Sequence, residues 1–386
     1  MAPTRFVHLA EARRRFGDRV DRHGGFLTAG DPLADAAVEA LADRPPAERE
    51  RLVDQALTRD VRSLPPELRA LRTSLSTLPF WADLDRARRG GEVLIRTGFF
   101  GGLVLGFRSL VAGYCSPAGN KPLVFSGRFR EAAARRLGET SRFVSLVYQP
   151  SSLAPGAPGW IAAARVRLMH AQIRRLLRAS PRWDGPAWGD PINQVDMAGT
   201  VLLFSLVLVD GLRMLGFRID REQCEDALHL WRIAGWVLGV EPELLCATEP
   251  EARVLWELLE ATQAPPDADS AELARALIES PVHEARSPSE RTRAERFLPL
   301  AYGVGRHLVG DRYADALGYP RTPWRLVAPA LRTLISGTGR LVGRLPGIDR
   351  LTLEAGLRYW RRTVEVGLAG EEARFELPRR VRHLPR

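Results

Sequence analysis

The chain has 386 residues, of which 45% are hydrophobic and 26% charged, and these proportions are typical of a folded protein with a large core. They exclude a disordered or fibrous chain. The net charge of +10 is scattered, and Lys121 is the single lysine among 56 basic residues, which indicates a general bias toward arginine. Because no basic stripe or aromatic platform accompanies the charge, we do not expect the protein to bind nucleic acid.

Three widely spaced cysteines lack any CxxC or zinc-finger spacing and indicate reduced thiols in the cytoplasm: Cys115, Cys224 and Cys246. The arginines at 13–15 are not followed by an apolar stretch, so no signal peptide is predicted. The longest apolar stretches, 98–107 and 197–209, are shorter than the ~20 residues that span a bilayer. The sequence therefore predicts a cytoplasmic protein without a transmembrane segment.

The first part of the chain is punctuated by glycine and proline. Residues 1–30 are polar and arginine-rich, and we expect them to form a loosely packed arm. From Asp31 the pattern becomes helical, and pairs of prolines then separate several short helices. Residues 91–113 combine many glycines with apolar residues. Because glycines have no side chain, this segment is expected to form the wall of a pocket for a flat cofactor or a long-chain substrate. The alternative is that the glycines allow close packing of helices.

The rest of the chain shows helical periodicity without strand-like alternation or a fixed repeat. Helices are expected at about 127–147, 160–179, 192–217, 222–238, 291–308, 324–335 and 351–366. The predicted class is all-α, with a helical domain at 31–280 and C-terminal helices at 281–386 that pack on the same domain. The segment 279–290 is the best candidate for a linker.

One histidine stands out within the helix predicted at 160–179. His170 lies at the edge of an apolar stripe that contains Val166, Met169 and Ile173, and several arginines surround it. A neutral imidazole that faces an apolar pocket, with cations nearby, is what a haem iron and its two carboxylates require. The alternative is a core histidine hydrogen-bonded to a carbonyl, which the local pattern alone favours. His229 is a rival ligand, but its apolar neighbours favour a core role.

Other common chemistries lack their motifs in this sequence. There is no Gly-x-Ser-x-Gly elbow and no Walker loop, and the glycines at 337–343 follow a helix rather than a strand. A di-iron site needs two Glu-x-x-His pairs; Glu225 and Asp226 before His229 come near this pattern, and no second pair exists. Ligands at zinc spacing are missing too. Ligation of a metal by one histidine remains, and haem is the common centre of that kind.

Four sequence segments resemble one oxygenase family: RLGET at 136–140, VRLMH at 166–170, WGDPINQ at 188–194 with Asp196 and Thr200 after it, and WRIAGWVLGV at 231–240. GDPLAD at 30–35 and LGYP at 317–320 extend the match. The family includes the bacterial latex-clearing rubber oxygenases and the fungal oxygenase of mycophenolic acid biosynthesis. The resemblance implies a globin-like helical core, with additional N- and C-terminal helices, that binds haem b.

The resemblance also implies roles for individual residues. His170 corresponds to the proximal iron ligand, and Arg136 and Thr140 to a functionally sensitive arginine and threonine. Arg174, one turn after His170, would lie near the haem and could pair with a propionate. Further candidates for contact with the haem are Arg165, Asn193 and Thr200; for Asn193 the alternative is a structural role at the junction of loop and helix, and for Thr200 a cap or junction role within its helix.

Glu139 marks a departure from the family pattern, because rubber-cleaving members have a lysine there that can occupy the far face of the iron. We include Glu139 among the catalytic candidates, and the missing export signal argues against rubber as substrate. The predicted function is O2-dependent oxidation, or cleavage of a C=C bond, in a hydrophobic, isoprenoid or unsaturated small molecule. One alternative is a haem-binding or sensor protein without turnover. The other is a basic helical protein that binds nucleic acid or anionic lipid without haem.

Overall fold

The computed structural model describes residues 2–58, 63–125, 133–342 and 347–367, with the side chains of 133–136 and 339–342 left undescribed. Over these ranges the chain is built from helices, and its only β-type pairing is an isolated bridge between Phe6 and Gln263. The predicted all-α class is therefore confirmed.

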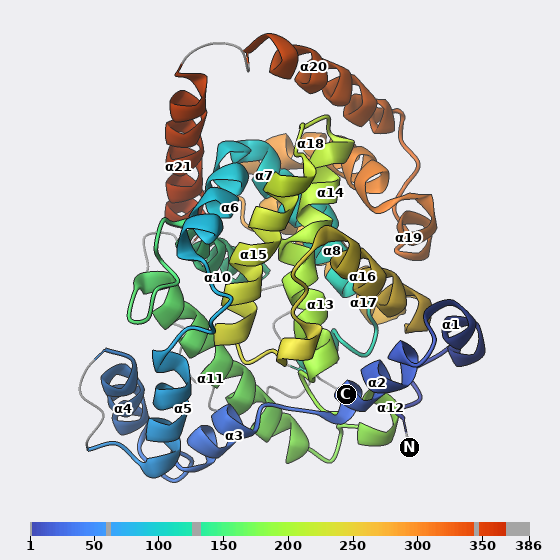
Figure 1. Ribbon diagram of the computed structural model, residues 1–386. Helices are drawn as coiled ribbons and strands as arrows, with labels where there is room; N and C mark the ends of the chain where they lie inside the picture. Colours follow the sequence, from blue (N-terminus) through green and yellow to red (C-terminus); the bar gives the residue numbers. More distant parts are fainter. Residues whose placement is uncertain (1, 59–62, 126–132, 343–346, 368–386) are drawn as a thin grey trace.

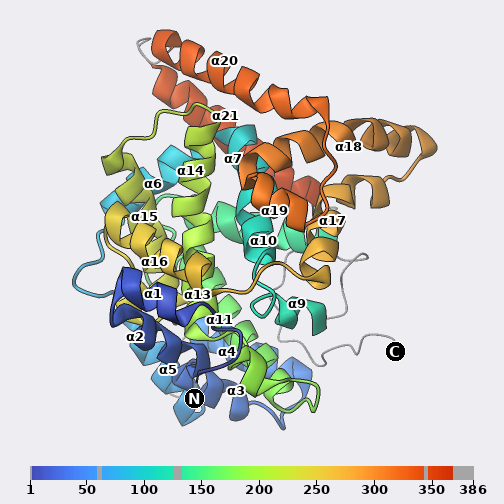
Figure 2. The ribbon, with the colours of Figure 1, turned by 90° about the vertical axis from the view of Figure 1, so that its right-hand side faces the viewer.

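The N-terminal residues are folded onto the rest of the protein, so the expectation of a loosely packed arm is wrong. They form α1 (Leu9–Phe16), α2 (Arg19–Gly25) and the short 3-10 helix η1 (Phe26–Thr28). Their apolar side chains pack with those of α13 (Gln194–Phe204) and α16 (Glu249–Thr262) in one cluster, whose buried members are Phe6, Ala12, Val20, Leu27, Val195 and Leu258. Figure 2 shows α1 and α2 lying beside these two helices. Burial of these few apolar side chains stabilises the packed segment, although its composition is rich in arginine.

Prolines begin the next three helices, as the sequence predicts. These are α3 (Pro32–Glu39), α4 (Pro46–Thr58) and α5 (Pro66–Ser76). Proline suits the first helical position because the amide that it lacks would have no partner there. The carboxylate of Asp31 caps α3 by accepting from the Ala34 amide at 3.2 Å.

The glycine-rich region bends sharply and serves mainly to pack helices together. It consists of α6 (Leu84–Arg96), α7 (Gly98–Val104), the π-helical turn η2 (Leu105–Leu110) and α8 (Val111–Tyr114). The axis turns by 91° between α6 and the following helices, at Gly98 with its φ of +48°. A Cβ at Gly90, Gly91 or Gly102 would collide with a neighbouring element. For these three glycines the helix-packing alternative is confirmed.

The centre of the molecule is a group of long, buried helices (Figure 1). They are α10 (Ala133–Tyr148), α11 (Pro158–Arg178), α13, α14 (Leu206–Met214) and α15 (Arg221–Val237). Helix α15 packs against α6, α11 and α13, and Trp231 on it stacks on Phe204 with ring centroids 4.8 Å apart. The helix predicted at 192–217 is interrupted at Ser205, which joins α13 to α14 with non-helical backbone angles.

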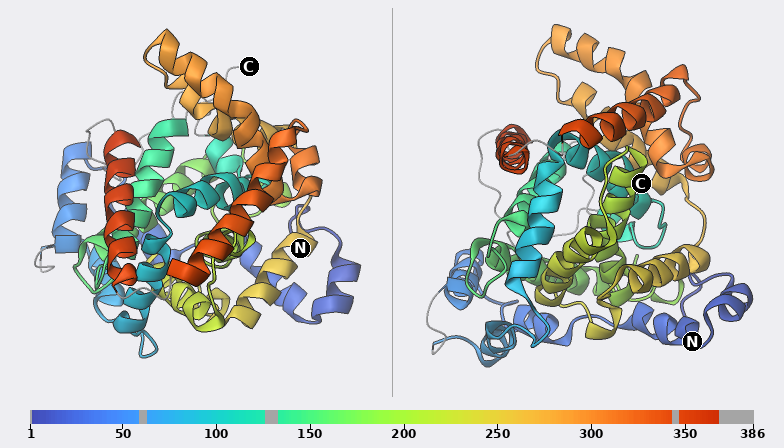
Figure 3. Two further views of the ribbon diagram at one scale, coloured as in Figure 1. Left: turned by 90° about the horizontal axis from the view of Figure 1, so that it is seen from above. Right: turned by 45° about the horizontal axis from the view of Figure 1, so that its top comes forward.

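The remaining elements complete the body of the protein. They are α9 (Lys121–Phe125), α12 (Gly185–Trp188), η3 (Pro242–Leu244), α16, α17 (Ala268–His283), α18 (Pro288–Val309), α19 (Asp311–Ala316), η4 (Pro323–Leu326), α20 (Val327–Val342) and α21 (Ile348–Gly367). Helix α21 packs on α6 and α10, and α18 packs on α17. Helix α20 crosses the top of the molecule (Figures 1 and 3).

The segment Gln194–Met214 is long and apolar enough to cross a membrane. The apolar stretch at 197–209, from which the sequence predicts no transmembrane segment, is shorter and lies within it. In the structure, 78% of its most apolar window is buried inside the protein. Core helices of folded proteins commonly have this composition.

Candidate functional site

Helix α11 carries His170 through the middle of the protein. Pro158 occupies its first turn, and the helix runs for 21 residues between α3, α10 and α15. His170 is four residues from both Val166 and Arg174, so the three side chains share one face of the helix. Both of these neighbours are buried. The face that carries His170 is therefore directed toward the interior.

His170 has an environment suited to metal ligation. The side chain lies deep in the protein yet keeps part of its surface accessible, and its Nδ1 atom is buried with no hydrogen-bond partner among the described residues. Burial, and to a smaller extent the charge of Arg174, lower the pKa of His170 to about 4, while Asp31 opposes the shift. The imidazole is thus neutral at pH 7, which is the form that binds iron.

His229 has the core role that the sequence indicates. Its Nε2 accepts a hydrogen bond from the Asp83 amide at 2.9 Å, just before the start of α6. The ring lies edge-on to Trp81 with centroids 6.1 Å apart. His229 is therefore engaged in holding α15 to the start of α6, in contrast to His170.

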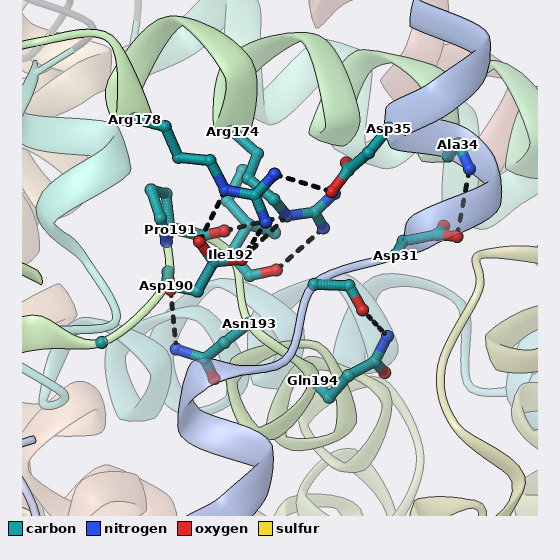
Figure 4. Close-up of polar contacts among 12 residues, drawn as sticks. Asp31, Ala34, Asp35, Arg174, Arg178, Asp190, Pro191, Ile192, Asn193 and Gln194 are labelled. Carbon is teal, nitrogen blue, oxygen red and sulfur yellow. Dashed lines mark hydrogen bonds and ion pairs between the residues drawn. The ribbon is translucent and has the colours of Figure 1, made fainter. Parts of the chain in front are cut away.

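Arg174 is fully buried, and its guanidinium is hydrogen-bonded and ion-paired to other groups of the protein (Figure 4). It donates to the carbonyl oxygens of Pro191 at 3.1 Å and Ile192 at 3.0 Å, and it forms ion pairs with Asp35 and Asp190. The expected pairing with a haem propionate is not what this geometry shows. Arg174 instead joins α11 to α3 and to the loop before α13.

Two more arginines of α11 contact acidic residues in or next to α3. Arg167 makes two hydrogen bonds to Asp31, at 2.6 and 2.9 Å, and both side chains are buried. Arg178 pairs with Asp35 at 2.9 Å and with Asp190 at 2.6 Å. This role of the 30–35 segment was not predicted from the sequence. The available signal was the spacing of Asp31 and Asp35, which places both carboxylates one helical turn apart.

Arg165 lies apart from this network. Its guanidinium donates to Glu50 at 3.3 Å and pairs with Asp54, both on α4. The proposed contact of Arg165 with the cofactor is therefore not supported, because the side chain is directed to a partly exposed ion pair between α11 and α4.

Asn193 and Gln194 hold the junction between the loop and α13. The Asn193 side chain caps α13 by accepting from the Asp196 amide at 3.0 Å, and it donates to the Asp190 carbonyl at 3.0 Å. Gln194 donates to the carbonyls of Gly30 at 2.7 Å and Gly239 at 2.9 Å. The structural alternative for Asn193 is the one that the structure shows.

Thr200 is exposed on α13, and its hydroxyl donates to the Asp196 carbonyl at 2.8 Å within the same helix. Its predicted contact with the cofactor is therefore not supported. Thr200 and Asp196 line a cavity, and none of its described lining residues belongs to α11.

Comparison with known proteins places the chain in one family. The family model described as "ER-bound oxygenase mpaB/B'/Rubber oxygenase, catalytic domain" matches residues 94–338, more than half of the chain. The chain belongs to this family. It is 25% identical over 344 residues to the rubber oxygenase of Streptomyces sp. (strain K30), covering 85% of this chain and 81% of that protein. The predicted family membership is confirmed, and because the family consists of oxygenases, the protein is an oxidoreductase.

The fold agrees with this assignment. A solved structure described as latex clearing protein LCP in the closed state superposes with a TM-score of 0.71 and 23% sequence identity. The match covers 91% of this chain and 94% of the solved chain. The helical architecture, including helices outside residues 94–338, is thus shared.

The residues of α10 that the family resemblance singles out lie on a neighbour of α11. Glu139 and Thr140 are half-buried on α10, which packs along α11. Arg136 belongs to the same helix, but its side chain is outside the described residues. The catalytic roles of these three residues stay predictions. Within the part of the chain that the structure describes, no three His, Cys, Asp or Glu side chains gather closely enough to hold a metal ion.

Proposed function

We propose that the protein is a haem b-dependent oxygenase whose iron is bound by His170. The observation that carries this proposal is the largely buried, neutral imidazole of His170 on α11, which keeps part of its surface accessible while its Nδ1 has no hydrogen-bond partner among the described residues. The Nε2 of His229 already accepts a backbone hydrogen bond, whereas the ring of His170 keeps accessible surface, so His170 is the better placed of the two to receive a ligand. Membership of an oxygenase family supplies the reaction class.

The described residues fit this cofactor at its proximal side. His170 supplies one neutral nitrogen ligand, and Val166 on the same face supplies apolar contact. Haem b, when bound, supplies the redox chemistry with O2. The buried pairs of Arg167 with Asp31 and of Arg174 with Asp35 fix the position of α11 and hence the direction of the imidazole. On α10, Glu139 and Thr140 offer a carboxylate and a hydroxyl that can orient a polar group beside the substrate.

We further propose that the substrate is a hydrophobic molecule with a carbon–carbon double bond, such as an isoprenoid. Support comes from the 25% identical relative, which is named a rubber oxygenase. Insertion of both atoms of O2 across the broken C=C bond would give two carbonyl groups. We place the protein in the cytoplasm, in keeping with its three free cysteines.

The test is oxygen consumption by the haem-loaded protein with a panel of isoprenoids and polyenes of increasing length, together with their saturated counterparts. We expect O2 uptake with at least one unsaturated compound, carbonyl products in a two-to-one ratio to O2, and no uptake with its saturated counterpart. Equal uptake with both compounds would contradict C=C cleavage.

A second candidate function is haem binding without turnover, and the observation that favours it is Glu139 at a position where rubber-cleaving relatives carry lysine. In that case the protein would bind haem through His170 but consume no O2 with any member of the panel.

A further inference from the structure

A cavity of about 120 Å³ lies where the N-terminal segment meets α8, α13 and α16. Its polar lining includes Arg5, His23, Ser116, Asp196, Thr200 and Glu260. Its apolar lining includes Phe6, Val195, Leu203, Trp256 and Leu259. None of the described lining residues belongs to α11, and Arg5, Phe6 and His23 precede the segment that matches the oxygenase family. The cavity is therefore lined by elements other than α11, the helix that carries His170.

His23 is the unusual residue of this lining. It is 3% exposed, its ring lies 6.2 Å from that of Phe6, and its buried Nδ1 finds no hydrogen-bond partner in the described residues. Because His23 lines the cavity, a molecule there that hydrogen-bonds to its imidazole would be stabilised. A neutral imidazole has one donor and one acceptor, and a hydroxyl group complements both.

The charges of the lining are compensated within the protein. Arg5 forms a two-pronged pair with Asp196, at 2.6 and 2.9 Å, and also donates to the Trp188 carbonyl at 3.3 Å. Glu260 accepts from the Tyr313 hydroxyl at 3.3 Å, and burial raises the pKa of its carboxyl group. An ionic ligand would find no unpaired group of opposite charge in this cavity, and it would lose its hydration shell on binding. The lining therefore favours an uncharged ligand.

The size of the cavity limits the ligand further. An apolar cavity of about 150 Å³ is known to hold one benzene molecule. A slightly smaller, partly open cavity suits one small ring or a short chain. We propose that this cavity binds a small uncharged molecule with an apolar body and one hydroxyl group, which hydrogen-bonds to His23. This site does not depend on haem binding by His170.

The proposal is tested by ligand-detected NMR titration of the full-length protein with phenol, toluene and benzoate. Phenol has the expected ring and hydroxyl, toluene lacks the hydroxyl, and benzoate carries a charge. We expect saturable binding of phenol, binding of toluene about tenfold weaker because one hydrogen bond is lost, and weaker binding still of benzoate. No saturable binding of phenol would mean that the cavity holds water only, and equal binding of phenol and toluene would exclude recognition by His23; either result overturns the proposal.

Variants locate the binding. His23→Leu should weaken phenol binding about tenfold, whereas His283→Leu, at an exposed histidine on α17, should leave it unchanged. Gly199→Leu is a second test, and it keeps His23. A Cβ at Gly199 would meet only Leu259, at 3.6 Å, so a larger side chain can be placed there. Because Gly199 lines the cavity, the leucine side chain would fill it. It should abolish phenol binding. Retention of wild-type affinity in either folded cavity variant would overturn the proposal.

Discussion

Three histidines of this chain have a buried Nδ1 without a hydrogen-bond partner among the described residues, but their surroundings differ. The Nε2 of His229 accepts a backbone hydrogen bond, His23 lines a cavity, and His170 lies on α11 with part of its surface accessible. Burial is the largest cause in each case and lowers the pKa of all three to about 4. The same neutral imidazole thus serves a structural hydrogen bond in one place and is available to a ligand in another.

The lowered pKa values predict how stability depends on pH. Between about pH 6.5 and pH 4 the unfolded state binds protons at these histidines and the folded state does not, so stability falls as the pH falls through this window. Each unit of pKa difference is worth about 1.4 kcal/mol. Urea unfolding at pH 7.5, 6 and 5 should show this loss, and His170→Gln should lose less than the wild type. The exposed-site control His283→Gln should behave like the wild type, and an equal loss in His170→Gln would contradict the account.

Arg174 is predicted to stabilise the protein without any cofactor. Arg174→Met removes the donor to the Pro191 and Ile192 carbonyls and one of the two arginines that pair with Asp35 and Asp190, so it should lower the free energy of unfolding of the haem-free protein by roughly 3 kcal/mol. Arg175, the next residue, pairs with Glu39 on the surface, and Arg175→Met should cost less than about 1 kcal/mol. Chemical denaturation of the haem-free variants measures both. If the two variants were equally stable, the structural role of Arg174 would be refuted.

At the scale of helices, close packing depends on glycine. A Cβ at Gly356 on α21 would collide with the carbonyl oxygen of Ile95 on α6. Gly337 on α20 has no atom within 4 Å of such a Cβ. The same residue type is therefore required for contact between helices in one place and is merely a weak helix former in the other.

This contrast predicts opposite effects of one substitution. Gly356→Ala should destabilise the protein by at least about 2 kcal/mol, because α21 must move away from α6. Gly337→Ala should be neutral or stabilise it by up to roughly 1 kcal/mol. Thermal unfolding of the two variants makes the comparison, and a loss of stability in Gly337→Ala as large as that in Gly356→Ala would show that the packing argument is wrong.

Helices could be predicted from the sequence where the signal was local. Prolines at first-turn positions predicted the helices α3, α4 and α5. Apolar periodicity predicted α11 to within a few residues. The partners of Arg174 could not be found in this way, because Asp35 and Asp190 are distant in sequence and meet only after folding. The N-terminal segment was misjudged because single apolar residues among arginines show little periodicity, although Phe6 and Val20 are buried.

At the scale of the whole molecule, the N-terminal segment is part of the fold. It covers α13 and α16 through an apolar cluster and through the pair of Arg5 with Asp196, and it forms one side of the cavity that His23 lines. The protein is therefore one body in which both termini of the described chain pack on the central helices, as Figures 1 and 2 show.

Integration of the N-terminal segment predicts that its core residues matter for global stability. Phe6→Ala should lower the free energy of unfolding by roughly 3 kcal/mol, because a buried aromatic side chain is lost. Phe80→Ala, at a fully exposed phenylalanine, should change it by less than about 0.5 kcal/mol. Urea titration followed by circular dichroism would show both effects, and a neutral Phe6→Ala would mean that the segment is a loose arm after all.

The most direct test of the central claim is the visible spectrum of the purified protein after addition of haemin. We predict a strong Soret band for the wild type and for the exposed-site control His283→Ala, and the loss of this band in His170→Ala, with circular dichroism confirming that each variant is folded. A wild-type protein that shows no Soret band, or a folded His170→Ala variant with an unchanged one, would contradict the assignment of His170 as the iron ligand.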